Sequence, residues 1–247
     1  MKRRRPRPVR VLKSLLLIAL MLFGGMLLYG YGRNHPEDLP WTELDLTRPV
    51  GAFTGRKLVQ LRGEAEQCRA LLGRAGVRFT ALPPRSGNGQ CGYDDAVRFT
   101  GGGALDIAYR PAGLGTSCPV AAALALWEWN AVQPAALQHF GRKVERIEHF
   151  GSYSCRRIYG RSEGSWSEHS TANAVDIAAF VLEDGTRISV AGDWTGDDPA
   201  ARFLHDARDG ACKLFATVLS PDYNKAHRDH LHHDQAERGA FGWRGCR

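Results

Sequence analysis

The sequence predicts an α+β fold preceded by one membrane helix, for three reasons. Residues 14–31 form an uncharged apolar run near the N-terminus. Behind this run, helical periodicity prevails first and strand-like segments follow, an order typical of α+β proteins. Glycine accounts for 28 of the 247 residues, which predicts short elements joined by many loops. The length allows one large domain or two small ones.

The net charge of +7 comes from a basic tail over residues 1–13. The tail contains no acid, and its seven basic residues are Lys2, Arg3, Arg4, Arg5, Arg7, Arg10 and Lys13. The rest of the chain holds 26 basic and 26 acidic residues, so it carries no net charge. A neutral body has no general attraction for polyanions, and we expect no nucleic-acid partner.

The apolar run predicts a signal-anchor helix over residues 14–31. Counted from Leu15 to Tyr31 it has 17 residues, the lower limit for crossing a hydrocarbon core of about 30 Å. Basic residues before it keep the tail in the cytoplasm and send the body across the membrane. The exit, LLYGYGRNH, lacks the small-residue pattern of a cleavage site. This favours an uncleaved anchor, with a cleaved secretory signal peptide as the alternative.

Cysteine usage agrees with export. None of the six cysteines forms a C-x-x-C pair, and none lies near another in the sequence: Cys68, Cys91, Cys118, Cys155, Cys212 and Cys246. An even number of cysteines in an exported chain predicts three disulfides, with fifteen pairings open. Six buried, reduced cysteines are the alternative.

The first part of the body reads as a linker followed by helices and short strands. Residues 32–55 are polar and contain three prolines, which predicts a linker, and the main domain is expected over residues 56–247. Periodicity and turn residues predict the elements in order. These are a helix at 57–76, a strand at 77–82, a turn-rich loop at 83–92, a strand at 104–109 and a helix at 119–140 that Pro134 kinks or divides.

The second part is richer in strands. Glu183-Asp184-Gly185 stands between two strand-like runs and predicts a hairpin. The elements expected here are a strand at 144–153, the hairpin strands at 173–180 and 186–191, a helix at 198–219 and a short strand within 227–234.

Two segments carry the residues of a metal site: SEHSTANAVDI (167–177) and HRDHLHHD (227–234). On a strand, Asp176 shares a face with two alanines while Val175 and Ile177 face the core. The same alternation places His230, His232 and Asp234 on one face. A His-Asp-His set leaves one tetrahedral position open, as in catalytic zinc sites. In the alternative reading, Glu168 and His169 only cap or solvate a loop.

H-x6-D followed by a distant H-x-H resembles the zinc signature of the LAS metallopeptidases, which include the M15-type D-Ala-D-Ala carboxypeptidases. Residues 40–247 also resemble the bacterial extensin-like C-terminal domain family. The matching stretches are PWTELDL, GVRFTAL, CGYDDAVRFTGG, CPVAAALALWEW, GSYSCR, SEHSTANAVDIAAF and AHRDHLHHD. The resemblance implies a LAS/Hedgehog-like fold with a small antiparallel sheet flanked by helices.

Carried over by position, the resemblance implies zinc ligands at His169, Asp176 and His232. It places His230 beside the metal as the proton-handling group. Some carboxypeptidases use a Glu three residues before the last ligand, and here Asp229 occupies that position. Asp229 is therefore the second candidate for the proton-handling group. A further departure is Ala172, which stands where the carboxypeptidase pattern has Gly. Arg156 or Arg157 matches the segment that supplies a substrate-binding arginine.

The expected function is therefore a zinc-dependent peptidoglycan peptidase that hydrolyses an amide bond in stem peptides or cross-bridges. The expected location is the bacterial inner membrane, crossed once, with the C-terminal domain in the periplasm. A non-catalytic wall-binding or scaffold protein that keeps the zinc fold is the alternative. A purely structural zinc domain is a third reading, which three ligands disfavour.

Overall fold

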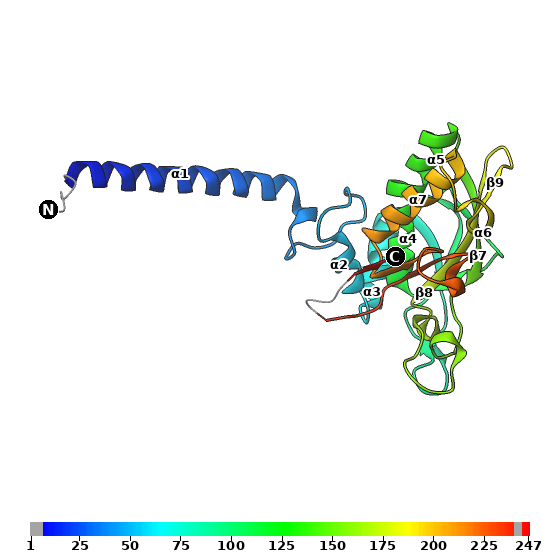
Figure 1. The fold of residues 1–247 in the computed structure, drawn as a ribbon. Helices are drawn as coiled ribbons and strands as arrows, with labels where there is room; N and C mark the ends of the chain where they lie inside the picture. Colours follow the sequence, from blue (N-terminus) through cyan, green and yellow to red (C-terminus); the bar gives the residue numbers. More distant parts are fainter. Residues whose placement is uncertain (1–6, 240–243) are drawn as a thin grey trace.

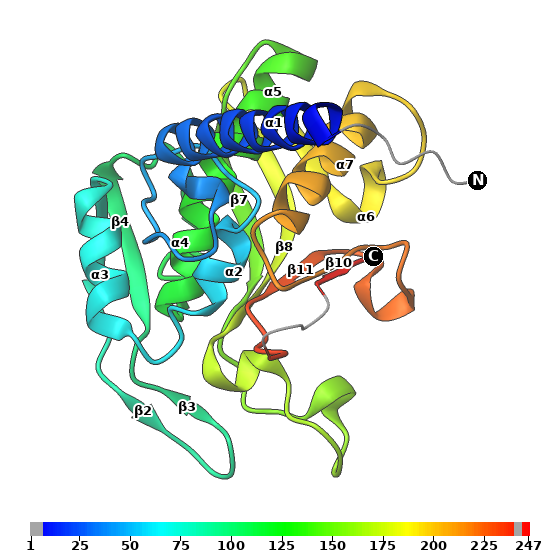
Figure 2. The same cartoon turned by 90° about the vertical axis from the view of Figure 1, so that its left-hand side faces the viewer.

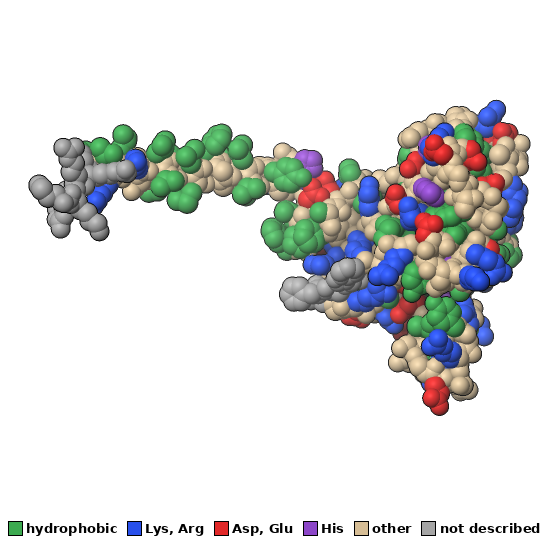
Figure 3. Space-filling model, in the orientation of Figure 1, with side chains coloured by type: hydrophobic (Ala, Val, Ile, Leu, Met, Phe, Trp, Pro, Cys, Tyr) green, Lys and Arg blue, Asp and Glu red, His purple; other side chains and the backbone are tan. Residues whose placement is uncertain are grey.

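The computed structural model describes residues 7–239 and 244–247 and places one long helix outside a single folded body (Figure 1). The helix, α1 (Arg7–Asn34), is long and apolar enough to cross a membrane, with a mean hydropathy of 2.3 over its most apolar stretch. A signal sequence passes the same test. Apolar side chains cover this helix on the face seen in Figure 3. Residues 1–6 of the basic tail lie outside the described residues.

The helices of the body are short. They are α2 (Thr54–Val59), α3 (Ala65–Arg74), α4 (Cys118–Trp127), α5 (Gln133–Phe140), α6 (Val190–Asp193) and α7 (Pro199–Cys212). Single turns are η1 (Pro36–Asp38), η3 (Ile158–Gly160), η4 (Glu168–Thr171) and η5 (Lys225–His227), and a π-helical turn, η2 (Glu128–Val132), joins α4 to α5. Pro134 cannot donate to the turn before it, which explains why the predicted helix at 119–140 is divided there.

The strands form one seven-stranded sheet, one three-stranded sheet and one small hairpin. The large sheet has the order β12-β10-β11-β8-β7-β5, with β9 also paired to β8. Its strands are β5 (Ala108–Arg110), β7 (Val144–Gly151), β8 (Ala174–Leu182), β9 (Arg187–Ser189), β10 (Thr217–Leu219), β11 (Leu231–Asp234) and β12 (Gly245–Cys246). The remaining strands are β1 (Val77–Ala81), β4 (Val97–Gly103) and β6 (Gly115–Thr116) in the second sheet, and β2 (Arg85–Ser86) and β3 (Gly92–Tyr93) in the hairpin.

The core lies between the large sheet and helices α4, α5 and α7, which cover one of its faces (Figure 1). The ring of Phe180 on β8 lies 5.7 Å from Trp127 on α4 and 5.0 Å from Phe203 on α7, and all three side chains are fully buried. Figure 2 shows β8, β11 and β10 side by side, as their pairing requires. The other face of this sheet, its open face, carries the polar side chains described below.

Three disulfides link distant parts of the chain: Cys68–Cys118, Cys91–Cys155 and Cys212–Cys246. The described cysteines therefore include no free thiol. The prediction of three disulfides is confirmed, and one of the fifteen possible pairings is selected.

Three element predictions need correction. The helix expected at 57–76 is two helices, because Gly63 between them adopts a φ of +82° that interrupts helical geometry. The helix expected at 198–219 ends at Cys212, and the chain continues into β10. The strand expected at 104–109 begins only at Ala108, while β4 was not predicted because its glycine-rich end resembles a loop.

Candidate metal centre

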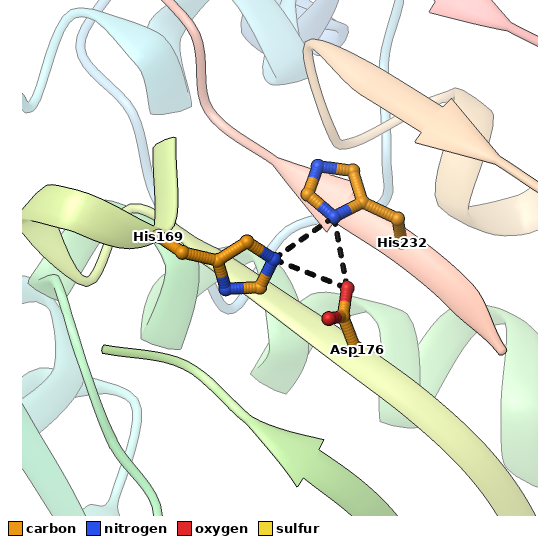
Figure 4. A group of neighbouring side chains, drawn as sticks. All are labelled: His169, Asp176 and His232. Atoms are coloured by element: carbon orange, nitrogen blue, oxygen red, sulfur yellow. Dashed lines mark hydrogen bonds and ion pairs between the residues drawn. The ribbon is translucent and has the colours of Figure 1, made fainter. Parts of the chain in front are cut away.

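Three side chains converge on the open face of the large sheet: His169, Asp176 and His232 (Figure 4). The Nε2 atom of His169 lies 3.2 Å from the Nδ1 atom of His232 and 3.2 Å from the Oδ1 atom of Asp176. The same Oδ1 atom lies 2.9 Å from the Nδ1 atom of His232. All three residues are buried. The structure thus brings together the three residues that motif spacing singled out.

His169 is positioned by the single turn η4. The Ser167 hydroxyl caps this turn by accepting a hydrogen bond from the backbone N–H of His169. The turn is closed by Ala172, whose φ of +55° lies in the left-handed region that favours glycine.

The orientation of the His169 ring follows from its outer nitrogen. Its Nδ1–H donates to the backbone carbonyl of Ser152 at 2.6 Å. The proton of a neutral ring is thereby assigned to Nδ1, and the lone pair on Nε2 faces Asp176 and His232.

Asp176 and His232 face each other across paired strands. Register places Asp176 of β8 directly opposite His232 of β11, while the neighbours Val175 and Ile177 lie in the hydrophobic core. The alternation predicted for β8 over these residues is therefore confirmed. Burial raises the pKa of Asp176, but hydrogen bonds and attraction from His169 and His232 outweigh burial and hold that pKa far below its usual range.

The outer nitrogen of His232 is also occupied. Its Nε2–H donates to Oδ2 of Asp234 at 3.1 Å, which directs Nδ1 toward the other two ligand atoms. Burial opposes protonation of this ring, but hydrogen bonds and attraction from Asp176 and Asp234 prevail and raise the pKa of His232 to about 9. A metal ion that binds here must therefore displace a proton from Nδ1.

The three ligand atoms fit a tetrahedral metal ion. Zinc binds His nitrogen and carboxylate oxygen at about 2.0–2.2 Å, which puts neighbouring ligand atoms roughly 3.3 Å apart. The spacings of 2.9–3.2 Å come close to this value. Both histidines also have the outer hydrogen-bond acceptor that metal-binding histidines commonly have. Three ligands leave one position for a water molecule or a substrate.

His230 lies beside this set, just before β11 begins. Its Nε2 atom is 3.6 Å from Oδ1 of Asp176, and its Nδ1–H donates to Oδ1 of Asp229 at 2.9 Å. Asp229 thus orients His230, and in the described part of the chain it makes no contact with the three ligands. His230 thus lies nearer than Asp229 to the three converging side chains.

His227, for which the sequence predicts no separate role, also lies beside the site. Its ring centre lies 5.1 Å from that of His230 and 5.9 Å from that of His232. Its Nδ1–H donates to Oδ1 of Asn224, whose Nδ2 donates in turn to the hydroxyl of Tyr159. Burial, with repulsion from His230 and His232, lowers the pKa of His227 to about 4. The available signal was the spacing H-x-x-H-x-H within the second segment.

The site opens into a cavity of about 700 Å³, here called the metal-side cavity. All three ligand residues line it, together with His227, His230 and Arg156. Arg157 does not line this cavity: its guanidinium lies 4.5 Å from the ring centre of Trp166 and donates to the carbonyl of Gly164. Of the two arginines expected at the substrate, the structure brings Arg156 to the site.

The remaining histidine of the second segment belongs to the core. His233 points to the opposite face of β11 and packs between Phe215 and Trp127, with ring centres 4.7 Å and 4.9 Å away. Burial lowers its pKa to about 3, so the ring is neutral. The predicted alternation within β11 is therefore confirmed.

One comparison with known proteins gives a match. A family model described as "Extensin-like protein C-terminus" matches residues 66–247, about three quarters of the chain. The matched region contains all three ligand residues, His227 and His230. No curated protein and no solved structure matches the chain.

Proposed function

The chain belongs to the extensin-like protein C-terminus family, and from this membership and its His-Asp-His site we propose that it is a zinc-dependent peptidoglycan peptidase. The proposed reaction is hydrolysis of an amide bond in stem peptides or cross-bridges. The observation that carries the proposal is the set of three converging nitrogen and oxygen atoms, all able to bind a metal ion, at the wall of a large cavity. The resemblance of H-x6-D and H-x-H to the LAS metallopeptidases supports the zinc assignment and a LAS-like fold.

The residues divide the chemistry among them. His169, Asp176 and His232 would hold zinc, whose chemistry when bound is to polarise a carbonyl and to lower the pKa of water to about 7. His230 accepts a proton from the attacking water and returns it to the leaving amine through Nε2, while Asp229 holds its Nδ1. Arg156 offers positive charge to the developing oxyanion or to a substrate carboxylate.

We place the body in the bacterial periplasm, anchored in the inner membrane by α1. Support comes from the apolar helix, the basic tail before it and the three disulfides. N-terminal sequencing of the protein from washed membranes tests this placement. Retention of residues 1–34 in the membrane fraction supports the anchor, and a new N-terminus after residue 25 supports a cleaved signal peptide.

A non-catalytic wall-binding protein is the second candidate. It is favoured by Asp229, which stands where some carboxypeptidases have a Glu and whose carboxylate is engaged by His230. In that case zinc would shape a binding surface without turnover.

One experiment separates the two functions. The full-length chain in detergent is incubated with purified muropeptides, with and without a chelator, alongside His232→Ala. A zinc-dependent product that His232→Ala fails to form supports the peptidase. Metal-dependent binding without any product supports the wall-binding protein. Zinc content near zero after purification without chelator contradicts the zinc site in both.

A further inference from the structure

A second cavity of about 620 Å³ lies next to the metal-side cavity and is lined in part by residues of β7 and β8. We call it the distal cavity, and its walls include Arg110, Arg146, Phe150 and Arg187. Asp229 lines the distal cavity, His230 lines the metal-side cavity, and these two residues are hydrogen-bonded at 2.9 Å. The two cavities therefore adjoin at the hydrogen-bonded pair of Asp229 and His230, and we call the two together the groove.

The size of the groove exceeds what one terminal residue needs. Pockets that enclose whole small-molecule ligands measure about 300–1,000 Å³. The volumes of both cavities fall in that range. The proposed metal ligands lie near the junction of the cavities, because Nε2 of His230 is 3.6 Å from Oδ1 of Asp176. A substrate bound at the junction has room to continue in both directions.

Positive charge is available on both sides of the junction. Within the described residues, Arg146 in the distal cavity and Arg156 in the metal-side cavity make no ion pair. Arg110 donates only to the adjacent carbonyl of Tyr109, and Arg187 is paired with Glu148 at 2.8 Å. Figure 3 shows Lys and Arg side chains on the flank of the body where β7 and β9 lie. Unpaired guanidinium groups suit carboxylates of a ligand.

Exposed apolar side chains also cluster along the groove. Outside α1, six large apolar side chains of the described chain are exposed. Four of them line the groove: Phe150 in the distal cavity, and Ile158, Tyr159 and Tyr223 in the metal-side cavity. Phe150 is 61% exposed, and its ring centre lies 5.8 Å from that of His230 in an edge-to-face arrangement. Such a concentration marks a binding surface.

From size, charge and apolar lining together, we infer that the groove binds an extended acidic peptide across the junction and that the protein is an endopeptidase. The inference rests on the proposed function and adds that the cleaved bond lies inside the bound peptide, not at its carboxyl end. In the reaction one water gives its hydroxyl to the carbonyl carbon and a proton to the amide nitrogen as the C–N bond breaks. The bound peptide carries a carboxylate on each side of that bond.

The test uses the zinc-loaded full-length chain and three probes. These are a cross-linked muropeptide dimer and two shorter peptides, one truncated on each side of the cleaved amide. We expect the dimer to be cut at least tenfold more efficiently than either truncated peptide. Arg146→Gln raises KM for the dimer about tenfold and has no effect on the peptide that lacks the distal side.

Arg142→Gln is the matched control, because Arg142 pairs with Asp184 at 3.3 Å and lines neither cavity. The inference is overturned if single residues are released stepwise from the carboxyl terminus. It is also overturned if Arg146→Gln raises KM equally for all three probes. If no probe is cut, this result contradicts the proposed hydrolysis but does not contradict the extended groove. Binding of a labelled dimer then tests the extended groove separately. Weaker binding by Arg146→Gln than by Arg142→Gln supports the extended groove, and equal binding overturns it.

Discussion

Each proposed histidine ligand is fixed by an acceptor on its outer nitrogen, and the two acceptors differ. His169 donates to a backbone carbonyl, that of Ser152, which no side-chain change removes. His232 donates to the carboxylate of Asp234, which also brings negative charge. We therefore expect zinc binding to depend on Asp234, whose carboxylate holds the outer nitrogen of His232.

Asp234→Asn tests this dependence. The amide keeps an oxygen acceptor near Nε2 of His232 but loses the charge, so we expect zinc to bind about 10- to 100-fold more weakly. Competition with a fluorescent zinc chelator measures the change. Asp184→Asn, on the exposed β8–β9 turn, is the control and keeps wild-type affinity. Equal affinities for the two variants contradict a supporting role for Asp234.

Zinc binding is expected to release a proton. Because Asp176 and Asp234 raise the pKa of His232 to about 9, its Nδ1 is protonated at pH 7.5 until the metal takes its place. Calorimetric titration in two buffers of different ionisation enthalpy should give about one proton released per zinc. Affinity should fall about tenfold for each pH unit below 9. A heat that is the same in both buffers contradicts the raised pKa.

The same pKa shift acts on folding when zinc is chelated. Protonated His232 is stabilised in the folded chain, and this contribution is complete below its unfolded pKa of about 6.5. As the pH rises toward 9 the contribution is lost. The thermal midpoint in chelator should therefore decline between pH 6.5 and 9. His232→Gln should flatten this decline, and a parallel decline in that variant contradicts its assignment to His232.

At the scale of elements, sequence periodicity predicted the helices and strands that are determined by residues close together in the chain. The β8–β9 hairpin follows from alternation around a turn containing Gly185, and both segments of the metal site were found by spacing. The pairing of β8 with β11, which sets Asp176 opposite His232, joins residues 56 positions apart and leaves no local trace. The distal cavity escaped prediction for the same reason, because its walls come from segments far apart in the chain.

The packing of α7 against the π-helical turn η2 gives a test with a matched control. A methyl group at Gly210 of α7 would lie 2.2 Å from Cβ of Ala131 in η2, so Gly210→Ala should destabilise the fold by about 1–3 kcal/mol. At Gly73 in α3 the same methyl group meets nothing within 4 Å, and Gly73→Ala should stabilise by about 0.5–1 kcal/mol. Urea unfolding measures both. Equal shifts would contradict the close contact between α7 and η2.

At the scale of the whole molecule, disulfides hold the walls of the groove to the body. Cys91–Cys155 ties the β2–β3 hairpin to the residue before Arg156, and Cys246, bonded to Cys212 of α7, lines the metal-side cavity. The residues that line these walls are therefore held by covalent links as well as by packing.

Replacing both Cys91 and Cys155 by Ser tests the first of these links. The bond spans 64 residues, and its loss should lower the free energy of unfolding by about 4 kcal/mol in the chain-entropy model. Denaturant titration measures this loss. The variant should also bind the labelled muropeptide dimer more weakly. A stability within 1 kcal/mol of wild type contradicts a supporting role for this disulfide.

The Cys91–Cys155 bond also makes the assembly of this part of the molecule depend on oxidation. A newly made copy in reducing surroundings carries two unlinked thiols, and the wall that presents Arg156 is untied. Only oxidation joins the hairpin to that wall. The two sides of the groove that this bond joins are therefore linked only after the chain has reached an oxidising compartment.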